Sequence, residues 1–210
     1  LPGFGENLID VTDYSITQLA ENIHLQLESY QLDSYYIIGH SLGGYVALEY
    51  AQLFPVNLKG IGLFHSTPFP DSSEKQINRN KTIEFIEKYG VSKFITTFVP
   101  TLFYSENRIK FKEDVNNMMD ICLQSSQKSV IEITKAMRDR NSSVEFLKKT
   151  ELPILFIIGK EDSFFKWEEI EEISWNVRSK KVVVLEKVGH LGMFESKEKS
   201  VNAVKSYVLS

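Results

Sequence analysis

Short apolar runs alternate along the chain with longer stretches in which apolar residues recur at helical spacing. Four runs are nearly continuous and rich in β-branched and aromatic side chains, and they cover residues 35–38, 58–64, 154–158 and 182–185. Continuous rather than alternating apolar runs are typical of strands in a parallel sheet that is covered on both faces. The pattern therefore predicts an α/β fold built on a mostly parallel, doubly wound sheet.

Helical patterns lie between and after these runs. The first begins after Ser15, whose spacing to Gln18 suggests a capping box, and the second must end before Pro55. Two more follow the third and fourth apolar runs. On the last helix the apolar face is expected to consist of Val201, Val204 and Val208.

Residues 66–150 interrupt the alternation of strands and helices. They contain no convincing strand, but apolar residues recur at helical spacing in several segments that Gly90 and Pro100 separate. We therefore expect a mostly helical insertion at residues 66–150, between two strands of a core formed by residues 1–65 and 151–210.

The strongest chemical signal is a Gly-His-Ser-Leu-Gly-Gly turn at residues 39–44, directly after an apolar run and directly before a helix. This G-x-S-x-G context is typical of a serine nucleophile held on a sharp turn, where flanking side chains would clash. The hydroxyl of Ser41 would project above the sheet. The backbone N–H of Leu42, at a helix N-terminus, could then donate to a developing oxyanion.

A nucleophilic serine needs a base, and the chain has four histidines. His24 lies in the first helical pattern and is interpreted as a surface or packing residue. His40 lies inside the turn and points away from the place of a base. His65 and His190 both follow predicted strands, at the sheet edge where Ser41 also lies. His190 is favoured because the order serine, acid, histidine matches the G-x-S-x-G pattern.

The acid that orients the base is expected just after the third apolar run. Asp162 lies there, at the same edge of the sheet as Ser41, and Glu161 is its local competitor. A carboxylate in this position would orient the imidazole and stabilise the imidazolium.

Composition and charge limit the other possibilities. The chain has 210 residues and a net charge of −4, which gives no electrostatic reason to expect nucleic-acid binding. The single cysteine, Cys122, excludes an intrachain disulfide and fits a reducing compartment, so a cytoplasmic location is expected. No apolar run reaches the roughly 18 residues of a membrane span. The sequence does not indicate an oligomeric state.

These motifs together resemble the α/β-hydrolase superfamily, in its cap-containing branch of small esterases, lactonases and carbon–carbon hydrolases. Residues 1–5 resemble the segment after the family's fourth strand, residues 39–44 its nucleophile turn, and residues 153–162 its seventh strand with the acid. Gly189, His190 and Glu195 resemble its histidine loop. The resemblance implies that residues 66–150 form a helical cap.

The resemblance also implies an N-terminal part that this sequence does not contain. The family's first three strands and the loop that donates the second oxyanion N–H would precede Leu1, so the fold resembles an N-terminally incomplete α/β hydrolase. Without those strands, the strand that ends before Ser41 would form an exposed apolar edge. We expect the bare chain to have poor stability and impaired catalysis.

The favoured function is hydrolysis of a small carboxylic ester or thioester through an acyl-enzyme, with no metal or organic cofactor. The substrate would be a small acyl compound. Its pocket is expected to be lined by His40, Phe69, Phe103, Tyr104 and Trp167.

Two alternatives remain open. The same three residues could serve carbon–carbon bond hydrolysis, elimination or acyl transfer. An arginine of the insertion that reaches a substrate carboxylate would favour this class, and Arg138 and Arg140 are the nearest candidates. The chain could also be a non-catalytic ligand-binding member of the family.

Overall fold

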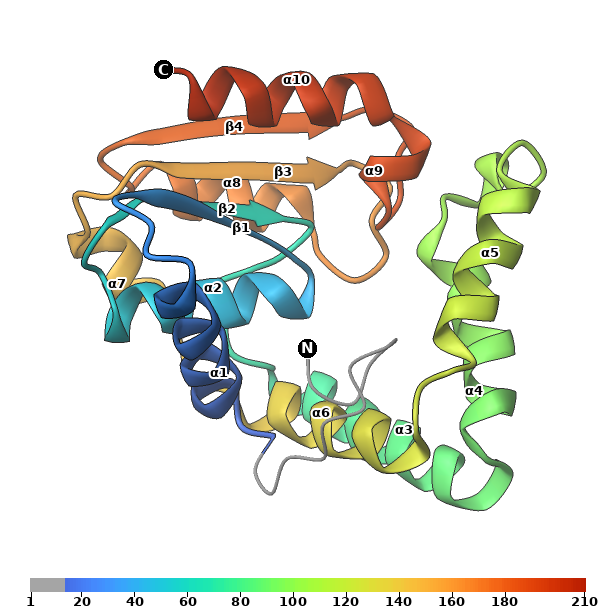
Figure 1. Ribbon diagram of the computed structural model, residues 1–210. Coiled ribbons are helices and arrows are strands. Elements are labelled where there is room, and N and C mark those ends of the chain that lie inside the picture. The colour runs from blue at the N-terminus through green and yellow to red at the C-terminus, as the bar shows by residue number, and fades with distance from the viewer. Residues whose placement is uncertain (1–13) are drawn as a thin grey trace.

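The computed structural model describes residues 14–210, and its centre is a four-stranded parallel sheet. The strands are β1 (Tyr35–His40), β2 (Leu58–Phe64), β3 (Ile154–Gly159) and β4 (Lys180–Leu185), and they lie in that order across the sheet (Figure 1). All three strand pairs are parallel. The four predicted strands and the α/β class are therefore confirmed. The expectation for residues 1–5 lies outside the described residues.

Helices cover both faces of this sheet. The apolar core on one face combines residues of α1 (Ile16–Ser29), α2 (Leu42–Leu53) and α8 (Trp167–Ser174) with the β3 residues Phe156 and Ile158. On the other face lies α10 (Lys197–Val208), preceded by the short α9 (Gly192–Glu195) (Figure 1). No helix within residues 14–210 is both long and apolar enough to cross a membrane.

The signals for helix ends are largely confirmed. The Ser15 hydroxyl accepts the N–H of Gln18 at 3.2 Å, as an N-cap does, and α2 ends before Pro55.

The expected apolar face of α10 is wrong for two of its three valines. Val204 packs against the core, but Val201 and Val208 are exposed, and the buried residues are Ser200, Ala203 and Tyr207. The small Ser200 and Ala203 lie on the side that faces the core, and the hydroxyl of Tyr207 reaches the carbonyls of Ile61 and Pro153.

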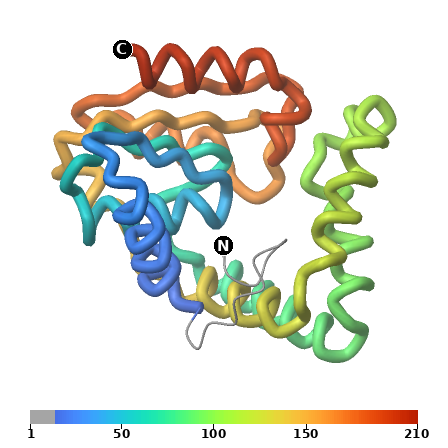
Figure 2. Tube along the Cα trace, in the orientation of Figure 1, coloured from blue at the N-terminus to red at the C-terminus, as the bar shows by residue number. Residues whose placement is uncertain are grey.

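The residues between β2 and β3 form helices and no strand, as predicted. These helices are α3 (Ser73–Tyr89), α4 (Val91–Phe98), α5 (Lys112–Cys122), α6 (Gln127–Asp139) and α7 (Val144–Lys149), with the short 3₁₀ turns η1 (Val99–Leu102) and η2 (Ser105–Asn107). Figure 2 shows that α4 and α5 stand beyond the ends of the strands, away from the sheet. By contrast, Leu147 of α7 is fully buried in the core below the sheet.

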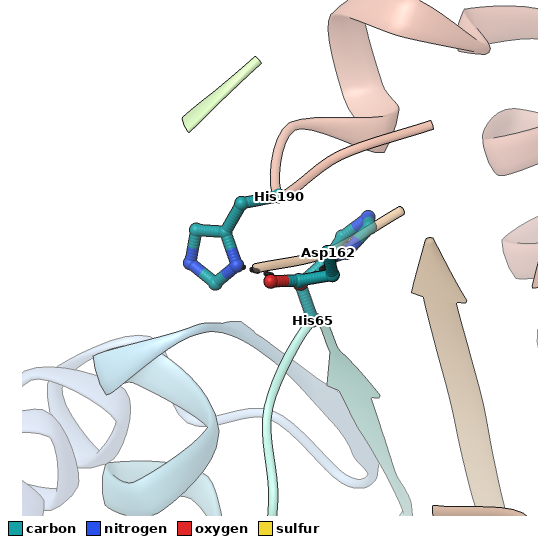
Figure 3. Close-up of side chains that lie close together, drawn as sticks. All are labelled: His65, Asp162 and His190. Carbon is teal, nitrogen blue, oxygen red and sulfur yellow. Dashed lines mark hydrogen bonds and ion pairs between the residues drawn. The ribbon is translucent and has the colours of Figure 1, made fainter. Parts of the chain in front are cut away.

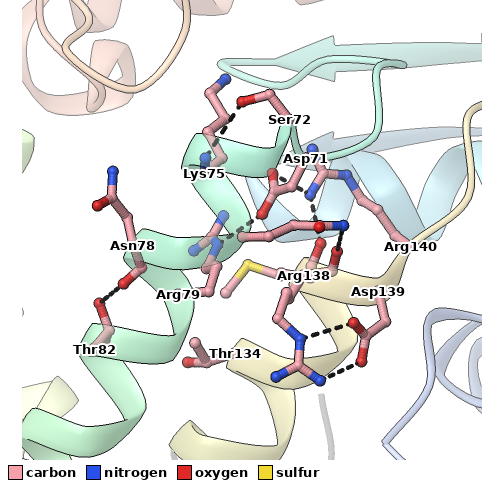
Figure 4. A network of polar contacts seen from close by, with 12 residues as sticks. Asp71, Ser72, Lys75, Asn78, Arg79, Thr82, Thr134, Arg138, Asp139 and Arg140 are labelled. Atoms are coloured by element: carbon pink, nitrogen blue, oxygen red, sulfur yellow. Dashed lines mark hydrogen bonds and ion pairs between the residues drawn. The ribbon is translucent and has the colours of Figure 1, made fainter.

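A buried ion-pair network joins the beginning and the end of this helical insertion. The carboxylate of Asp71, just before α3, binds Arg140, just after α6, at 2.6 Å and Arg79 of α3 at 3.0 Å (Figure 4). The Arg140 guanidinium also donates to the carbonyl of Phe69 and lies over the ring of Tyr45. These bonds fix the place where the chain leaves the core and the place where it returns.

Strand β1 forms one edge of the sheet. Within residues 14–210 it pairs only with β2, and its residues from Tyr35 to Ile38 are half-buried. An apolar hollow of about 220 Å³ lies along this edge, between β1, α1 and α2. The predicted apolar edge is therefore present in the described part of the chain.

Tyr207→Phe should lower the free energy of unfolding by about 1 kcal/mol. The buried hydroxyl of Tyr207 lies 2.6 Å from the carbonyl of Pro153 and 3.1 Å from that of Ile61, so its removal leaves carbonyls without this donor. Urea unfolding measures the change. The matched change Tyr30→Phe, at a tyrosine that is 69% exposed, should have no effect. Equal stabilities of the two variants would contradict the role given to Tyr207.

Candidate active site

Ser41 lies in a strained turn between β1 and α2. Its backbone has φ 51° and ψ −116°, which is uncommon for a residue other than glycine. The Ser41 N–H donates to the carbonyl of Phe64 at the end of β2, at 2.9 Å, and this bond holds the turn against the neighbouring strand. Its side chain makes no capping bond to α2. The sharp turn predicted at Ser41 is therefore present.

Two glycines make this turn possible. A Cβ atom on Gly39 would lie 2.0 Å from the carbonyl oxygen of Gly43, and one on Gly44 would lie 2.3 Å from the hydroxyl of Ser66. Neither approach is tolerable for a carbon atom. Gly43 has open space around it, so it is not required for the same reason.

Asp162 and His190 meet beyond the carboxyl ends of β3 and β4. Nδ1 of His190 lies 2.8 Å from Oδ2 of Asp162, and both side chains are buried. Burial alone would raise the pKa of the Asp162 carboxyl. The hydrogen bonds from His190 and His65 outweigh burial and hold this pKa well below its usual range, so the group is an anion. Glu161, its sequence competitor, is exposed to solvent.

His65 lies on the other side of the same carboxylate. Its Nδ1 is 3.1 Å from Oδ2 of Asp162, and its side chain is fully buried (Figure 3). His65, Asp162 and His190 are residue types that bind zinc, and their ligand atoms lie within 4.8 Å of one another. Both Nδ1 atoms, however, are at direct hydrogen-bonding distance from one carboxylate oxygen. We therefore interpret the cluster as a hydrogen-bonded network.

His40 supports the backbone of His190. Its Nε2 lies 2.8 Å from the carbonyl oxygen of His190. Burial and the neighbouring His190 lower the pKa of His40 to about 3, so this ring is neutral and its Nε2–H donates to the carbonyl. The turn that carries Ser41 thereby also holds the loop that carries His190.

The helical insertion holds the same loop from the opposite side. The His190 N–H donates to the carbonyl of Leu102 at 2.7 Å. Glu195 accepts the N–H of Gly189 on Oε1, and on Oε2 it accepts the N–H of Tyr104 and the side-chain amide of Asn107. One carboxylate thus links the histidine loop to Tyr104 and to η2.

The other expected pocket residues lie in several places. Phe103 is buried beside Phe111 and Phe194, and Tyr104 follows it against Glu195. Trp167 begins α8 and lies under Lys160, whereas Phe69 contributes its carbonyl to Arg140.

The sequence reasoning missed the two phenylalanines after Asp162. The N–H groups of Phe164 and Phe165 donate to Oδ1 of Asp162, and both rings lie near the His190 ring, with centroids 5.1 and 5.5 Å away. An aspartate whose carboxylate accepts the N–H groups two and three residues later is a known turn signal, so this local pattern could have been found.

A cavity of about 390 Å³ lies outside this cluster. It is located between α1, α2 and α6, and neither Ser41, Asp162 nor His190 lines it. Among residues 14–210, the Ser41 hydroxyl and Nε2 of His190 have no hydrogen-bond partner. These are the two atoms that a nucleophile and its base would use.

The fold and the cluster define an α/β protein with a strained serine and a buried histidine–aspartate pair at the same edge of the sheet. Residues 1–197 match the family described as "alpha/beta hydrolase fold", and the chain therefore belongs to this family of hydrolytic enzymes.

Similar proteins carry hydrolase names. The chain is 25% identical to Lipase 3 of Moraxella sp. (strain TA144) over 99% of its own length and 67% of the relative's. It is 24% identical to monoacylglycerol lipase abhd6-A of Xenopus laevis, covering all of the chain and 66% of that protein. The chain thus spans about two thirds of the length of these relatives.

Solved structures confirm the fold. An esterase from Thermogutta terrifontis superposes with a TM-score of 0.90 at 24% identity, over 99% of this chain and 77% of that one. An esterase from Exiguobacterium antarcticum gives a TM-score of 0.88 at 22% identity, over 99% and 79%.

The free energy of unfolding should decrease as the pH is lowered, and the variant His40→Gln should show a smaller decrease. In the folded state the pKa of His40 is about 3 rather than 6.5, so below pH 6.5 the unfolded chain binds more protons and folding is disfavoured. The loss is about 2 kcal/mol between pH 7 and pH 5. Glutamine keeps a donor for the His190 carbonyl without taking up a proton. Urea unfolding at pH 7, 6 and 5 should therefore give a flatter curve for the variant, and parallel curves would contradict this account.

Glu195→Gln should loosen the histidine loop. The amide group would turn a donor toward N–H groups that the carboxylate now accepts, and a lost bond to a charged group costs about 1.5–3 kcal/mol. We expect a lower free energy of unfolding, measured by urea unfolding. Glu198→Gln, in an exposed residue of α10, is the matched control. Identical behaviour of the two variants would show that Glu195 does not hold the loop.

Proposed function

We propose that the protein is a serine hydrolase that cleaves a small carboxylic ester or thioester through an acyl-enzyme. Ser41 is the nucleophile, His190 the general base and Asp162 the acid that orients His190. The observation that carries this proposal is the strained Ser41 turn at the same sheet edge as the buried bond between His190 and Asp162. The names of the relatives, lipases and a monoacylglycerol lipase, support the same class of reaction.

The proposed mechanism follows from where the His190 ring carries its proton. When the His190 ring is neutral and donates Nδ1–H to the Asp162 anion, its lone pair is on Nε2 and can take the proton of the Ser41 hydroxyl. The serine oxygen attacks the acyl carbonyl, and the imidazolium then protonates the leaving alcohol or thiol. Water, deprotonated by the same nitrogen, releases the acid and restores Ser41.

The oxyanion would be held by backbone N–H groups. Leu42 is the first residue of α2, so its N–H is one of those without a partner inside the helix.

An apolar acyl group fits the surroundings of His190. The ring of Phe164 lies 5.1 Å from that of His190 and 5.6 Å from that of Phe98 on α4. Phe94 continues this aromatic row along α4. We propose that residues 66–150 act as a cap over a core of residues 1–65 and 151–210. The pocket would combine this row with His40, Phe69, Phe103, Tyr104 and Trp167.

No observation favours the alternative that uses a cap arginine to bind a carboxylate. Arg140 already binds Asp71 in a buried pair, and Arg138 binds Asp139 and Asn80. Each guanidinium is therefore already paired with a carboxylate of the protein itself.

Ser41→Ala should reduce hydrolysis of p-nitrophenyl acetate by about 10³-fold or more, because the covalent step is removed. A fluorophosphonate probe should label the parent protein on Ser41 and leave the variant unlabelled. Ser29→Ala, at an exposed serine near the end of α1, is the matched control and should keep both properties. Parent-like turnover by Ser41→Ala would refute the proposal.

A further inference from the structure

A second buried histidine lies against the proposed acid, and the mechanism above does not use it. His65 follows β2, is fully buried and has a backbone φ of 47°. We propose that His65 is a positioning residue: as a neutral imidazole protonated on Nδ1, it orients Asp162 from the side opposite His190. The inference rests on the proposed function for its catalytic consequence, but not for the state of the ring.

The proton on His65 can be placed from its neighbours. The N–H of Gly192 points at Nε2 over 3.1 Å, and an N–H can only donate, so Nε2 carries a lone pair. A neutral imidazole then has its proton on Nδ1, which faces the anionic Oδ2 of Asp162 at 3.1 Å. The same lone pair excludes an imidazolium, in agreement with the lowered pKa that burial gives this ring.

One neighbour favours the opposite tautomer. The N–H of Gly159 lies 3.2 Å from Nδ1 of His65, as if Nδ1 were an acceptor. With the proton on Nε2 instead, the Nε2–H and the N–H of Gly192 would be two donors facing each other. The lone pair of Nδ1 would then face the Asp162 anion. A single strained contact at Gly159 is the smaller penalty, because the bond from Nδ1–H to a carboxylate is charge-assisted.

This tautomer completes the hydrogen bonding of Asp162. Oδ2 accepts Nδ1–H of His190 at 2.8 Å and Nδ1–H of His65 at 3.1 Å. Oδ1 accepts the N–H groups of Phe164 and Phe165 at 2.8 and 3.3 Å. Because the carboxylate is fully buried, loss of one donor leaves an unsatisfied lone pair and lets the carboxylate rotate.

His65 also joins the loops that carry the acid and the base. Its Nδ1 contacts the loop after β3, and its Nε2 accepts the N–H of Gly192, the first residue of α9, which follows the loop that carries His190. A Cβ atom at Gly192 would lie 2.6 Å from Nε2, so this position needs glycine to approach the ring. Figure 3 shows the His65 and His190 side chains meeting at Asp162.

The tautomer can be measured without any substrate. Histidine-labelled ¹⁵N protein, observed through two-bond ¹H–¹⁵N correlations at pH 7 and pH 5, should show one neutral ring protonated on Nδ1 that is absent from His65→Asn. A His65 ring protonated on Nε2, or doubly protonated at pH 5, would overturn the proposal.

Catalysis gives a second test with paired variants. His65→Leu removes the donor, whereas His65→Asn places an amide N–H where Nδ1–H was and tolerates a positive φ. For His65→Leu we expect kcat to fall by about 10–100-fold per fluorophosphonate-labelled site, with KM within about twofold. For His65→Asn, most of kcat should return.

The pH profile separates positioning from packing. The titratable groups around His65 are Asp162, His190 and His40. The ring centroids of His190 and His40 lie 5.6 and 5.9 Å from that of His65. Losing a donor concentrates negative charge on Asp162, so the acid limb of kcat/KM for His65→Leu should move up by about half a pH unit or more. His24→Leu, which removes a hydrogen-bonded histidine far from the site, should leave that limb in place.

These measurements separate a positioning role of His65 from a packing role, and both from a failure of the proposed function. Equal losses in His65→Leu and His65→Asn with an unmoved acid limb would reduce His65 to a packing residue. If the parent protein cleaves no ester and takes up no probe, the proposed function fails, and the tautomer measurement alone decides the state of His65.

Discussion

The structure depends on a buried anion. Asp162 is removed from water at the end of β3, and an isolated carboxylate there would be prohibitively costly. Four N–H groups make it tolerable, two from histidine rings and two from the backbone that follows it. Since those donors come from three different loops, the charge holds the ends of β2, β3 and β4 in one arrangement. The same charge orients the imidazole of His190 for proton transfer in the proposed mechanism.

The parallel sheet explains why distant residues can meet around this charge. All four strands run in one direction, so the residues after each strand emerge at the same edge. Ser41 follows β1, His65 follows β2, Asp162 follows β3 and His190 follows β4. The strain at Ser41 and His65, both with positive φ, occurs at two adjacent strand ends, where the chain must turn sharply away from the sheet.

Much of this arrangement could be predicted because it depends on local patterns. Continuous apolar runs indicate buried parallel strands, and glycines around Ser41 indicate a turn that leaves no room for Cβ atoms. The role of His65 could not be predicted, because it depends on contacts with Asp162 and Gly192, 97 and 127 residues away. The buried face of α10 was misjudged for a related reason. Val201 and Val208 are more apolar than Ser200 and Ala203, but shape at the sheet surface and a hydrogen bond from Tyr207 decide which side faces inward.

The proposed base is held by the two parts of the molecule that a substrate would lie between. Its N–H is bound by Leu102 of the insertion and its C=O by His40 of the serine turn, so neither can shift without moving His190. Glu195 strengthens the first of these links through Tyr104 and Asn107. A displacement of η1 or η2 would therefore change the position of the base relative to Ser41. In the proposed mechanism the insertion would therefore affect the rate of proton transfer as well as the fit of the substrate, through the same few hydrogen bonds.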